Sequence, residues 1–216
     1  GTPMRAVRAQ SCTAVFVNGT FLLFDAGAGA QRSMENLIFP IAELDALFLT
    51  HFHSDHIADV GEVISRSWLR GRRAPLTIYG GKGISRIVEG FSQVYALDNH
   101  YRSAHHGEEL FPQNSLSAVA KLVEEPNSNG RVIYEKNSVT VTAFKVNHPP
   151  VEPALGYRID YAGKSVVISG DTAETEALKT MSQGANILVS DVLSRDLVEA
   201  AECGSKQLGN QSNMKI

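Results

Sequence analysis

Three histidines and an aspartate lie within one short segment of this sequence, His51-Phe52-His53-Ser54-Asp55-His56. The segment follows the mostly apolar run Leu44 to Leu49, which is typical of a buried strand. Neutral imidazoles and carboxylates are the ligands that zinc and similar divalent ions bind in proteins. Because a cluster this dense is hard to explain as packing, it predicts a metal centre at the end of that strand.

The spacing within the cluster divides it between two ions. His51 and His53 are two positions apart, so on an extended segment both rings point to the same side. Asp55 and His56 follow where the chain turns toward the next predicted helix, and they point toward a second ion. Two metal ions roughly 3.5–4 Å apart can activate a water and hold both the attacking and the leaving oxygen.

One loop cannot enclose such a site, so further ligands must come from later in the chain. His148 follows the predicted strand Val139 to Val146, and Asp171 follows the predicted strand Lys164 to Ser169. Taken alone, His148 would be interpreted as a surface or core histidine and Asp171 as a helix cap. Beside the first cluster we expect both as ligands, with the Asp171 carboxylate able to bridge two cations.

The composition is typical of a single globular domain, residues 1–216, with a sizeable core, because 43% of the 216 residues are hydrophobic and 20% are charged. A net charge of -3 gives no overall basic field to attract nucleic acid. Cys12 and Cys203 form no disulfide framework, which favours a reducing compartment, and no apolar run is long enough to span a membrane. We therefore expect a cytoplasmic protein that does not enter a membrane.

Apolar periodicity and turn residues predict the elements that must position these ligands. Strands are predicted at Cys12–Val17, Thr20–Phe24, Leu44–Leu49, Leu76–Tyr79, Arg131–Tyr134, Val139–Val146, Leu155–Tyr161, Lys164–Ser169 and Ile187–Ser190. Helices are predicted at Gln31–Leu37, Ile57–Leu69, after Gly83 to about Ala96, at Glu174–Met181 and at Arg195–Cys203. Asn18-Gly19 and Ala162-Gly163 are hairpin turns, and Asn99 to Glu109 is expected to be irregular. Strands dominate each half, so we expect an α/β (α+β) fold of two mixed sheets with helices outside.

The order of these motifs resembles the metallo-β-lactamase superfamily. Leu49 to His56 matches the family's central motif in full, and Leu23 to Gly27 is similar to its strand-to-Asp-x-Gly turn. Gly1-Thr2-Pro3 resembles the end of its Gly-Thr-Gly-x-Pro opening. His148 followed by Gly156-Tyr157-Arg158, and then Val167 to Thr172, is similar to the ribonuclease Z and arylsulfatase-like branch.

The resemblance implies an αββα sandwich with two metal ions in a cleft at the strand ends. Zinc is the first choice, although Mn²⁺ or Fe²⁺ would also suit the ligands. Carried over residue by residue, His51, His53 and His148 bind the first ion, Asp55 and His56 bind the second, and Asp171 bridges. The resemblance further implies that a metal-bound hydroxide attacks the substrate and that Asp55 accepts a proton. We also expect Asp25 to support the ligand loop by hydrogen bonding rather than to bind the metal.

The sequence also departs from the family pattern. The family places a further histidine in a Thr-His motif after a final helix and strand, preceded by another in a Tyr-His-Ser/Thr segment, yet no histidine follows His148. The first strand of the family also has no counterpart before Gly1-Thr2-Pro3. From these departures we expect a chain truncated at both ends that lacks the last ligand of the second metal.

Three more residues are candidates for contact with substrate. His105 and His106 lie in the segment expected to be irregular, as part of either a cleft wall or a solvated loop. Arg158 could approach an anionic substrate, or it could pair with a neighbouring carboxylate within its strand.

The first functional hypothesis is a metal-dependent hydrolase of a small anionic ester, either a phosphodiester or a sulfate ester. RNA is a further candidate, but bacterial ribonuclease Z grips transfer RNA with an arm inserted between the segments equivalent to Arg158 and Ser169, which a short hairpin joins here. Because dimers are common in the family, a homodimer is also considered. The alternatives are hydrolysis of a lactone, thioester or β-lactam, and a non-catalytic metal-binding remnant.

Overall fold

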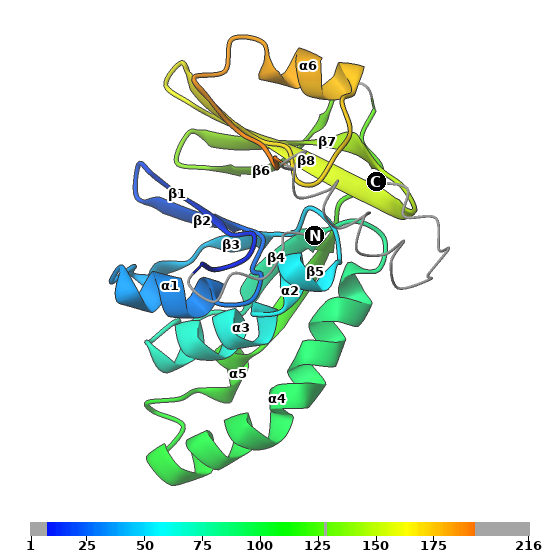
Figure 1. Cartoon of the computed structure of the whole chain (residues 1–216). Helices are drawn as coiled ribbons and strands as arrows, with labels where there is room; N and C mark the ends of the chain where they lie inside the picture. Colours follow the sequence, from blue (N-terminus) through cyan, green and yellow to red (C-terminus); the bar gives the residue numbers. More distant parts are fainter. Residues whose placement is uncertain (1–7, 128, 193–216) are drawn as a thin grey trace, which may run out of the picture.

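Two five-stranded sheets pack face to face in the computed structural model, which describes residues 8–127 and 129–192 (Figure 1). The first sheet contains, in spatial order, β1 (Thr13–Val17), β2 (Thr20–Phe24), β3 (Ala46–Phe48), β4 (Leu76–Gly80) and β5 (Ala118–Leu122). The second contains β10 (Ile187–Val189), β9 (Lys164–Ile168), β8 (Val151–Tyr161), β7 (Val139–His148) and β6 (Arg131–Lys136).

Helices cover the outer side of both sheets. Those of the first half are α1 (Ala30–Asn36), the short 3-10 turn η1 (Ile41–Glu43), α2 (Ser54–Ile57), α3 (Val60–Leu69), α4 (Ile84–His106) and α5 (Gln113–Leu116). The second sheet is covered by α6 (Glu176–Ser182) (Figure 1). This layering confirms the two mixed sheets with outer helices that the sequence pattern predicted, and it is the αββα sandwich that the family resemblance implied.

Both sheets are mixed, as expected. In the first, β1 is antiparallel to β2, and β2 to β5 are parallel. In the second, β10 is parallel to β9, and the other pairs are antiparallel. Asn18 and Gly19 make the predicted hairpin turn with φ angles of 47° and 67°, the left-handed conformations that a two-residue turn of this kind needs.

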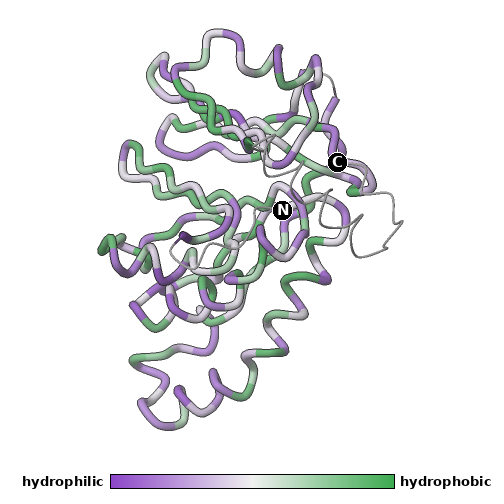
Figure 2. The backbone as a smooth tube through the Cα atoms, in the orientation of Figure 1, coloured by the Kyte–Doolittle hydropathy of each residue, from purple (hydrophilic) through white to green (hydrophobic). Residues whose placement is uncertain are grey.

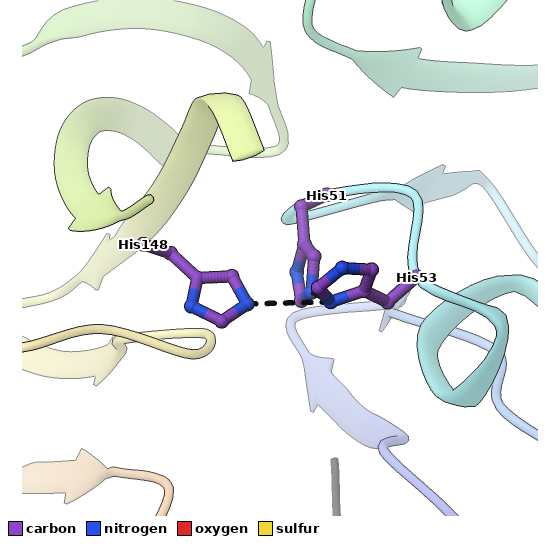
Figure 3. Close-up of side chains that lie close together, drawn as sticks. All are labelled: His51, His53 and His148. Atoms are coloured by element: carbon purple, nitrogen blue, oxygen red, sulfur yellow. Dashed lines mark hydrogen bonds between the residues drawn. The ribbon is translucent and has the colours of Figure 1, made fainter. Parts of the chain in front are cut away.

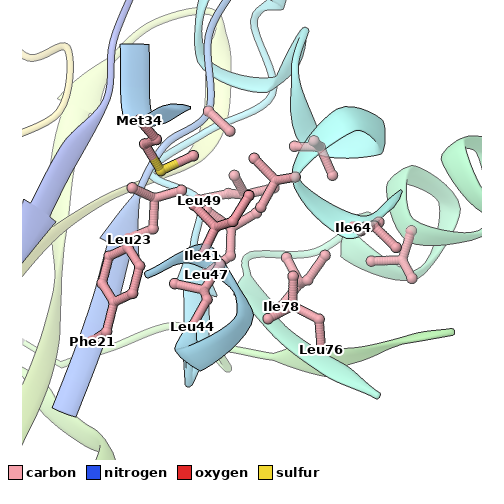
Figure 4. Close-up of a cluster of buried hydrophobic side chains, with 14 of the residues drawn as sticks. Phe21, Leu23, Met34, Ile41, Leu44, Leu47, Leu49, Ile64, Leu76 and Ile78 are labelled. Atoms are coloured by element: carbon pink, nitrogen blue, oxygen red, sulfur yellow. The ribbon is translucent and has the colours of Figure 1, made fainter. Parts of the chain in front are cut away.

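The buried apolar side chains form three layers, because alternate side chains of a strand face opposite sides of its sheet. In β2, Phe21 and Leu23 pack against the helices, whereas Leu22 and Phe24 pack between the two sheets. Figure 4 shows the cluster on the helix side, which Met34 and Ile64 complete from α1 and α3. The central strands are therefore apolar on both faces, and Figure 2 shows hydrophobic stretches on strands of both sheets and hydrophilic ones in many outer loops.

The main difference from the predicted elements is the length of α4. The helix was expected to end at about Ala96, but it continues to His106, so the predicted irregular segment from Asn99 is wrong over most of its length. The extension is polar and therefore lacks an apolar period, yet Asn99 and Ser103 are buried on its inner face and Arg102 pairs with Asp98. Gly107, with φ 87°, ends the helix.

Other boundaries differ more modestly. The helix predicted at Ile57–Leu69 is split into α2 and α3, and the strand predicted from Leu155 begins earlier, at Val151. Both α5 and β5 were missed, since β5 is short and half-exposed. The helix predicted at Arg195–Cys203 lies outside the described residues. No helix in the described part of the chain is long and apolar enough to cross a membrane.

A buried hydroxyl joins the two sheets next to the predicted metal cluster. The Tyr157 side chain on β8 is fully buried, and its hydroxyl donates a 2.6 Å hydrogen bond to the backbone oxygen of Leu49. Leu49 comes just before Thr50 and His51. Its backbone N–H donates to the backbone oxygen of Tyr79 on β4. The second sheet therefore helps to fix where the ligand loop leaves the first sheet.

We expect Tyr157→Phe to lower the free energy of unfolding by about 1–2 kcal/mol, because the Leu49 oxygen would lose a buried partner. Urea denaturation measures the change. Tyr101→Phe is the matched control, because Tyr101 is 61% exposed and should show no change. Equal stability of the two variants would contradict the role of the hydrogen bond.

Candidate metal centre

Three imidazoles converge from two distant segments. His51 and His53 lie on the loop after β3, and His148 ends β7 (Figure 3). His51 Nε2 lies 3.0 Å from His53 Nδ1, and His148 Nε2 lies 3.3 Å from the same His53 atom. One nitrogen from each ring lies within 4.8 Å of the other two. The structure thus brings together the three residues predicted to bind the first metal.

A second donor group shares His51 and continues deeper into the protein. It consists of His51, His56 and Asp171, all buried, again with ligand atoms within 4.8 Å of one another. His56 Nε2 lies 3.1 Å from Asp171 Oδ1, whereas His148 Nε2 lies 3.9 Å from Asp171 Oδ2. The two oxygens of Asp171 are therefore directed toward histidines of different groups.

Asp25 supports both groups from beneath. Its Oδ1 accepts a 2.8 Å hydrogen bond from the Thr50 backbone N–H, and its Oδ2 accepts a 2.9 Å bond from the Thr50 hydroxyl. His56 Nδ1 lies 2.8 Å from Asp25 Oδ2, and His51 Nδ1 lies 3.1 Å from the Thr50 hydroxyl. If Nδ1 carries the proton in both rings, each keeps an Nε2 lone pair for a metal, and outer partners commonly fix ligand histidines in this way.

Close backbone approaches explain the glycines around the loop. A Cβ on Gly27 would lie 1.9 Å from the backbone oxygen of Asp55, so only glycine allows this contact. Gly170 has φ 61°, and a Cβ there would lie 2.8 Å from Thr50 Cβ. The Asp-x-Gly turn and the Gly-Asp-Thr segment therefore both pack directly against the ligand loop.

The charges of the site favour a bound cation. Burial and the neighbouring His56 lower the pKa of His51 to about 3, so this ring is neutral, as a ligand must be. Burial by itself would lower the pKa of His56, but hydrogen bonds to Asp171 and Asp25 raise it to about 10. Burial would raise the pKa of Asp171, but His56 lowers it to about 2. The two carboxylates thus attract positive charge to this point.

These residues fit a metal centre by their spacing as well as by their type. Two ligands that each lie ~2.0–2.1 Å from a tetrahedral ion are about 3.3–3.4 Å apart. The separations of 3.0 and 3.3 Å among the three histidines are close to this value. A mixed set of imidazoles and carboxylates suits zinc and other first-row divalent ions.

Asp55, the remaining predicted ligand, lies at the edge of this centre. Its Oδ2 is 4.0 Å from His56 Nε2, and its side chain is 14% exposed. It is therefore near the second group and reachable from solvent, although its oxygens are farther from the histidine than those of Asp171.

The three predicted substrate contacts lie elsewhere. His105 and His106 are in the last turn of α4, roughly 30 Å along the helix from its start beside Phe52, so they do not form a wall of this centre. Arg158 also lies away from the centre. Val151 is the residue of β8 that pairs with His148, whereas Arg158 is further along the same strand and pairs with Thr142. Its guanidinium binds Asp160, Ser165 and the Met181 backbone oxygen, which supports the alternative of pairing within the sheet.

Thr50 is the functional residue that the sequence reasoning missed. It appeared only as part of the motif, but its backbone and hydroxyl connect Asp25 to His51. A small hydroxyl residue between an apolar strand and a histidine cluster is the signal that could have identified it.

Comparison with known proteins identifies a family for this chain. The sequence pattern of the metallo-beta-lactamase superfamily matches residues 5–196. Ribonuclease Z of Mycolicibacterium gilvum (strain PYR-GCK) is 34% identical over 204 residues, which cover 93% of this chain and 68% of that protein. Ribonuclease Z of Mycobacterium bovis (strain BCG / Pasteur 1173P2) is 33% identical over 194 residues, 88% of this chain and 66% of that protein.

Solved structures share the fold at lower identity. The short form of human tRNase Z superposes with a TM-score of 0.68 at 19% identity, over 90% of this chain and 76% of that one. Zinc-bound PqqB from Methylobacterium extorquens superposes with a TM-score of 0.59 at 20% identity, over 90% of this chain and 64% of that one.

We expect Asp25→Asn to weaken metal binding by about 10–100-fold, because an amide cannot accept all the hydrogen bonds from Thr50 and His56. Competition with a chelator measures the affinity. Asp45→Asn is the control, since Asp45 also accepts a backbone N–H, that of Phe21, but contacts none of the histidines. Similar affinities in the two variants would contradict the supporting role of Asp25.

We expect His148→Ala to weaken metal binding more than Asp25→Asn does, because it removes a donor from the three-histidine group. Elemental analysis after dialysis against a weak chelator measures the metal retained per chain. His105→Ala, at the far end of α4, should retain the wild-type amount. If His148→Ala, His105→Ala and the wild type retained equal amounts of metal, the metal would bind at another site.

Proposed function

Because the chain belongs to the metallo-beta-lactamase superfamily and is a metal-dependent hydrolase of its ribonuclease Z branch, we propose that it cleaves phosphodiesters with two zinc ions. The observation that carries the proposal is the pair of donor groups that share His51. One group is made only of imidazoles, and the other adds a carboxylate, so the two could hold neighbouring ions.

In this proposal His51, His53 and His148 would hold one ion, and Asp55 and His56 would hold the other. Asp171 would contribute to both, which is supported by the direction of its two oxygens toward His56 and His148. Bound ions would supply Lewis acidity, which activates water at neutral pH and stabilises negative charge on the reacting phosphoryl group.

The chain's own residues orient and protect this arrangement. Asp25 and Thr50 hold the rings of His56 and His51 with their Nε2 atoms free. Asp55 Oδ2, near His56 and partly accessible, is placed to accept the proton of the attacking water. The buried positions of His51, His56 and Asp171 keep bulk water from one side of the centre, so the substrate must approach from the side of the exposed His53.

A phosphodiester fits better than the other ester classes. Two adjacent cations suit a substrate that is already anionic, and the two mycobacterial relatives compared above are named ribonuclease Z. The turn Ala162-Gly163 joins β8 directly to β9, with Tyr161 paired to Lys164, so no arm extends from this hairpin to grip a large RNA. The proposed substrate is therefore a small or single-stranded phosphodiester.

Zinc-loaded protein should hydrolyse bis-p-nitrophenyl phosphate and a short single-stranded RNA, and it should turn over p-nitrophenyl sulfate, thioesters and lactones far more slowly. Release of p-nitrophenol and gel analysis of the RNA measure the rates. Asp55→Asn should reduce kcat on the phosphodiester by about 10²–10⁴-fold, the usual contribution of a proton acceptor.

Asp98→Asn is the matched control, because Asp98 lies on α4, where its carboxylate pairs with Arg102. It should keep the wild-type rate. Preferred turnover of thioesters or lactones would replace the proposed substrate class. No turnover of any substrate by protein that holds two zinc ions would indicate a metal-binding protein without hydrolase activity.

A further inference from the structure

The two candidate ligands that the second sheet supplies come from strands that are not neighbours. His148 ends β7, Asp171 follows β9, and β8 lies between these two strands. The hydrogen bonds of the sheet therefore do not join the two strand ends directly. His148 Nε2 nevertheless lies 3.9 Å from Asp171 Oδ2, which calls for a separate contact that fixes their spacing.

The ring of His148 has little support of its own. The two buried histidines of the centre are each held through Nδ1 by a neighbouring oxygen. Within the described part of the chain, the polar contacts of the His148 ring are with His53 and Asp171, which are candidate ligands themselves. The position of this ring therefore depends on the backbone that carries it.

The backbone just before His148 is freed from the ladder between β7 and β8. The register of that ladder shifts between Val146 and His148, at Asn147. Opposite this shift β8 holds Glu152 and Pro153, and the proline has no N–H to donate. The backbone groups of Asn147 can therefore bond elsewhere, as is common where a bulge redirects a side chain next to a functional site.

Thr172 and Ala173 bind both backbone groups of Asn147. The Asn147 N–H donates a 3.0 Å hydrogen bond to the Thr172 hydroxyl oxygen, and the Ala173 N–H donates a 2.9 Å bond to the Asn147 oxygen. Asn147 immediately precedes His148, and Thr172 immediately follows Asp171. This clasp, formed by Asn147, Thr172 and Ala173, therefore joins the two ligand segments directly, without passing through β8.

The clasp also relates His148 to the first sheet. Gly170 turns the chain with φ 61° and packs so closely on the ligand loop that a Cβ there would lie 2.8 Å from Thr50 Cβ. Asp171 and Thr172 follow directly, so their positions are set relative to that loop. The backbone before His148 is then held in place through the Thr172 hydroxyl.

We propose that Thr172 is a positioning residue of the metal centre, and that its hydroxyl sets the spacing between His148 and Asp171. The inference rests on the proposed function, because it takes these two residues to hold metal. Without the hydroxyl, the Asn147 N–H would bond to water, and the tie between the two ligand segments would be lost. Since partners outside the ligands commonly change metal affinity by about 10–100-fold, we expect an effect of that size.

Thr172→Val removes the hydroxyl at similar volume, and Thr172→Ser keeps it. Thr140→Val is the matched control, because Thr140 lies near the opposite end of β7 from His148 and valine is well tolerated on a strand. Competition with a chelator should show about 10–100-fold weaker Zn²⁺ binding by Thr172→Val. Thr172→Ser and Thr140→Val should bind Zn²⁺ like the wild type. Thr172→Ala, which also lacks the hydroxyl, should behave like Thr172→Val.

A second measurement separates positioning from stability. Co²⁺ in place of Zn²⁺ makes the centre visible, because the absorption of bound Co²⁺ changes with its coordination geometry. Thr172→Val should alter the Co²⁺ spectrum of the folded protein, and Thr172→Ser should restore it. A hydroxyl that served only the fold would change the unfolding temperature and leave the spectrum as it is.

The outcomes distinguish this inference from the proposed function. Wild-type Zn²⁺ affinity and an unchanged Co²⁺ spectrum in Thr172→Val would overturn the inference and leave the hydrolase proposal standing. Failure of Thr172→Ser to restore binding would also overturn it, because the methyl group rather than the hydroxyl would then matter. Wild-type protein that binds Zn²⁺ but cleaves no phosphodiester would contradict the proposed function alone, and wild-type protein that binds no metal would contradict both.

Discussion

The carboxylate of Asp25 is the interaction on which the rest of the site depends. It is almost fully buried at the end of β2, in a residue with φ 58° that turns the chain out of the sheet. Its oxygens accept hydrogen bonds from the backbone and hydroxyl of Thr50, and they face His56 Nδ1. A buried carboxylate needs several such partners to offset its lost hydration, so the loop that supplies them is held in one conformation.

The sandwich architecture converts that local constraint into a site with ligands from distant parts of the chain. Each central strand of the first sheet is apolar on both faces, because helices cover one face and the second sheet covers the other. The second sheet is held against the ligand loop by the Tyr157 hydroxyl on Leu49 and by the Leu155 N–H on Thr50. His148 and Asp171 therefore reach the loop from strands of the opposite sheet.

The charge distribution of the centre suits a cation rather than an empty polar cavity. Asp25 and Asp171 lie on either side of His56, and the pKa of this ring is raised by them despite its burial. Divalent ions placed among these carboxylates and imidazoles would balance the same negative charge. The arrangement also accounts for the position of Asp55, which lies outside the most buried part of the centre and keeps access to water.

The sequence by itself determined the parts of the protein that are encoded locally. The cluster from His51 to His56, the turn at Asn18-Gly19 and most strands could be predicted from residue type, spacing and apolar period. The family resemblance also identified His148 and Asp171 in advance. Local patterns could not reveal that α4 continues through a polar segment, because its inner face is buried by contacts with other helices.

Only the tertiary structure decided which of these residues meet. His105, His106 and Arg158 had suitable chemistry, but they lie far along α4 and β8 from the histidine loop, and the guanidinium of Arg158 is already bound within its sheet. The convergence of His51, His148 and Asp171 and the support from Thr50 depend on packing between segments distant in sequence. Residue spacing can place a side chain on a strand or helix, but the distances between such elements are set by how the layers bury their apolar faces.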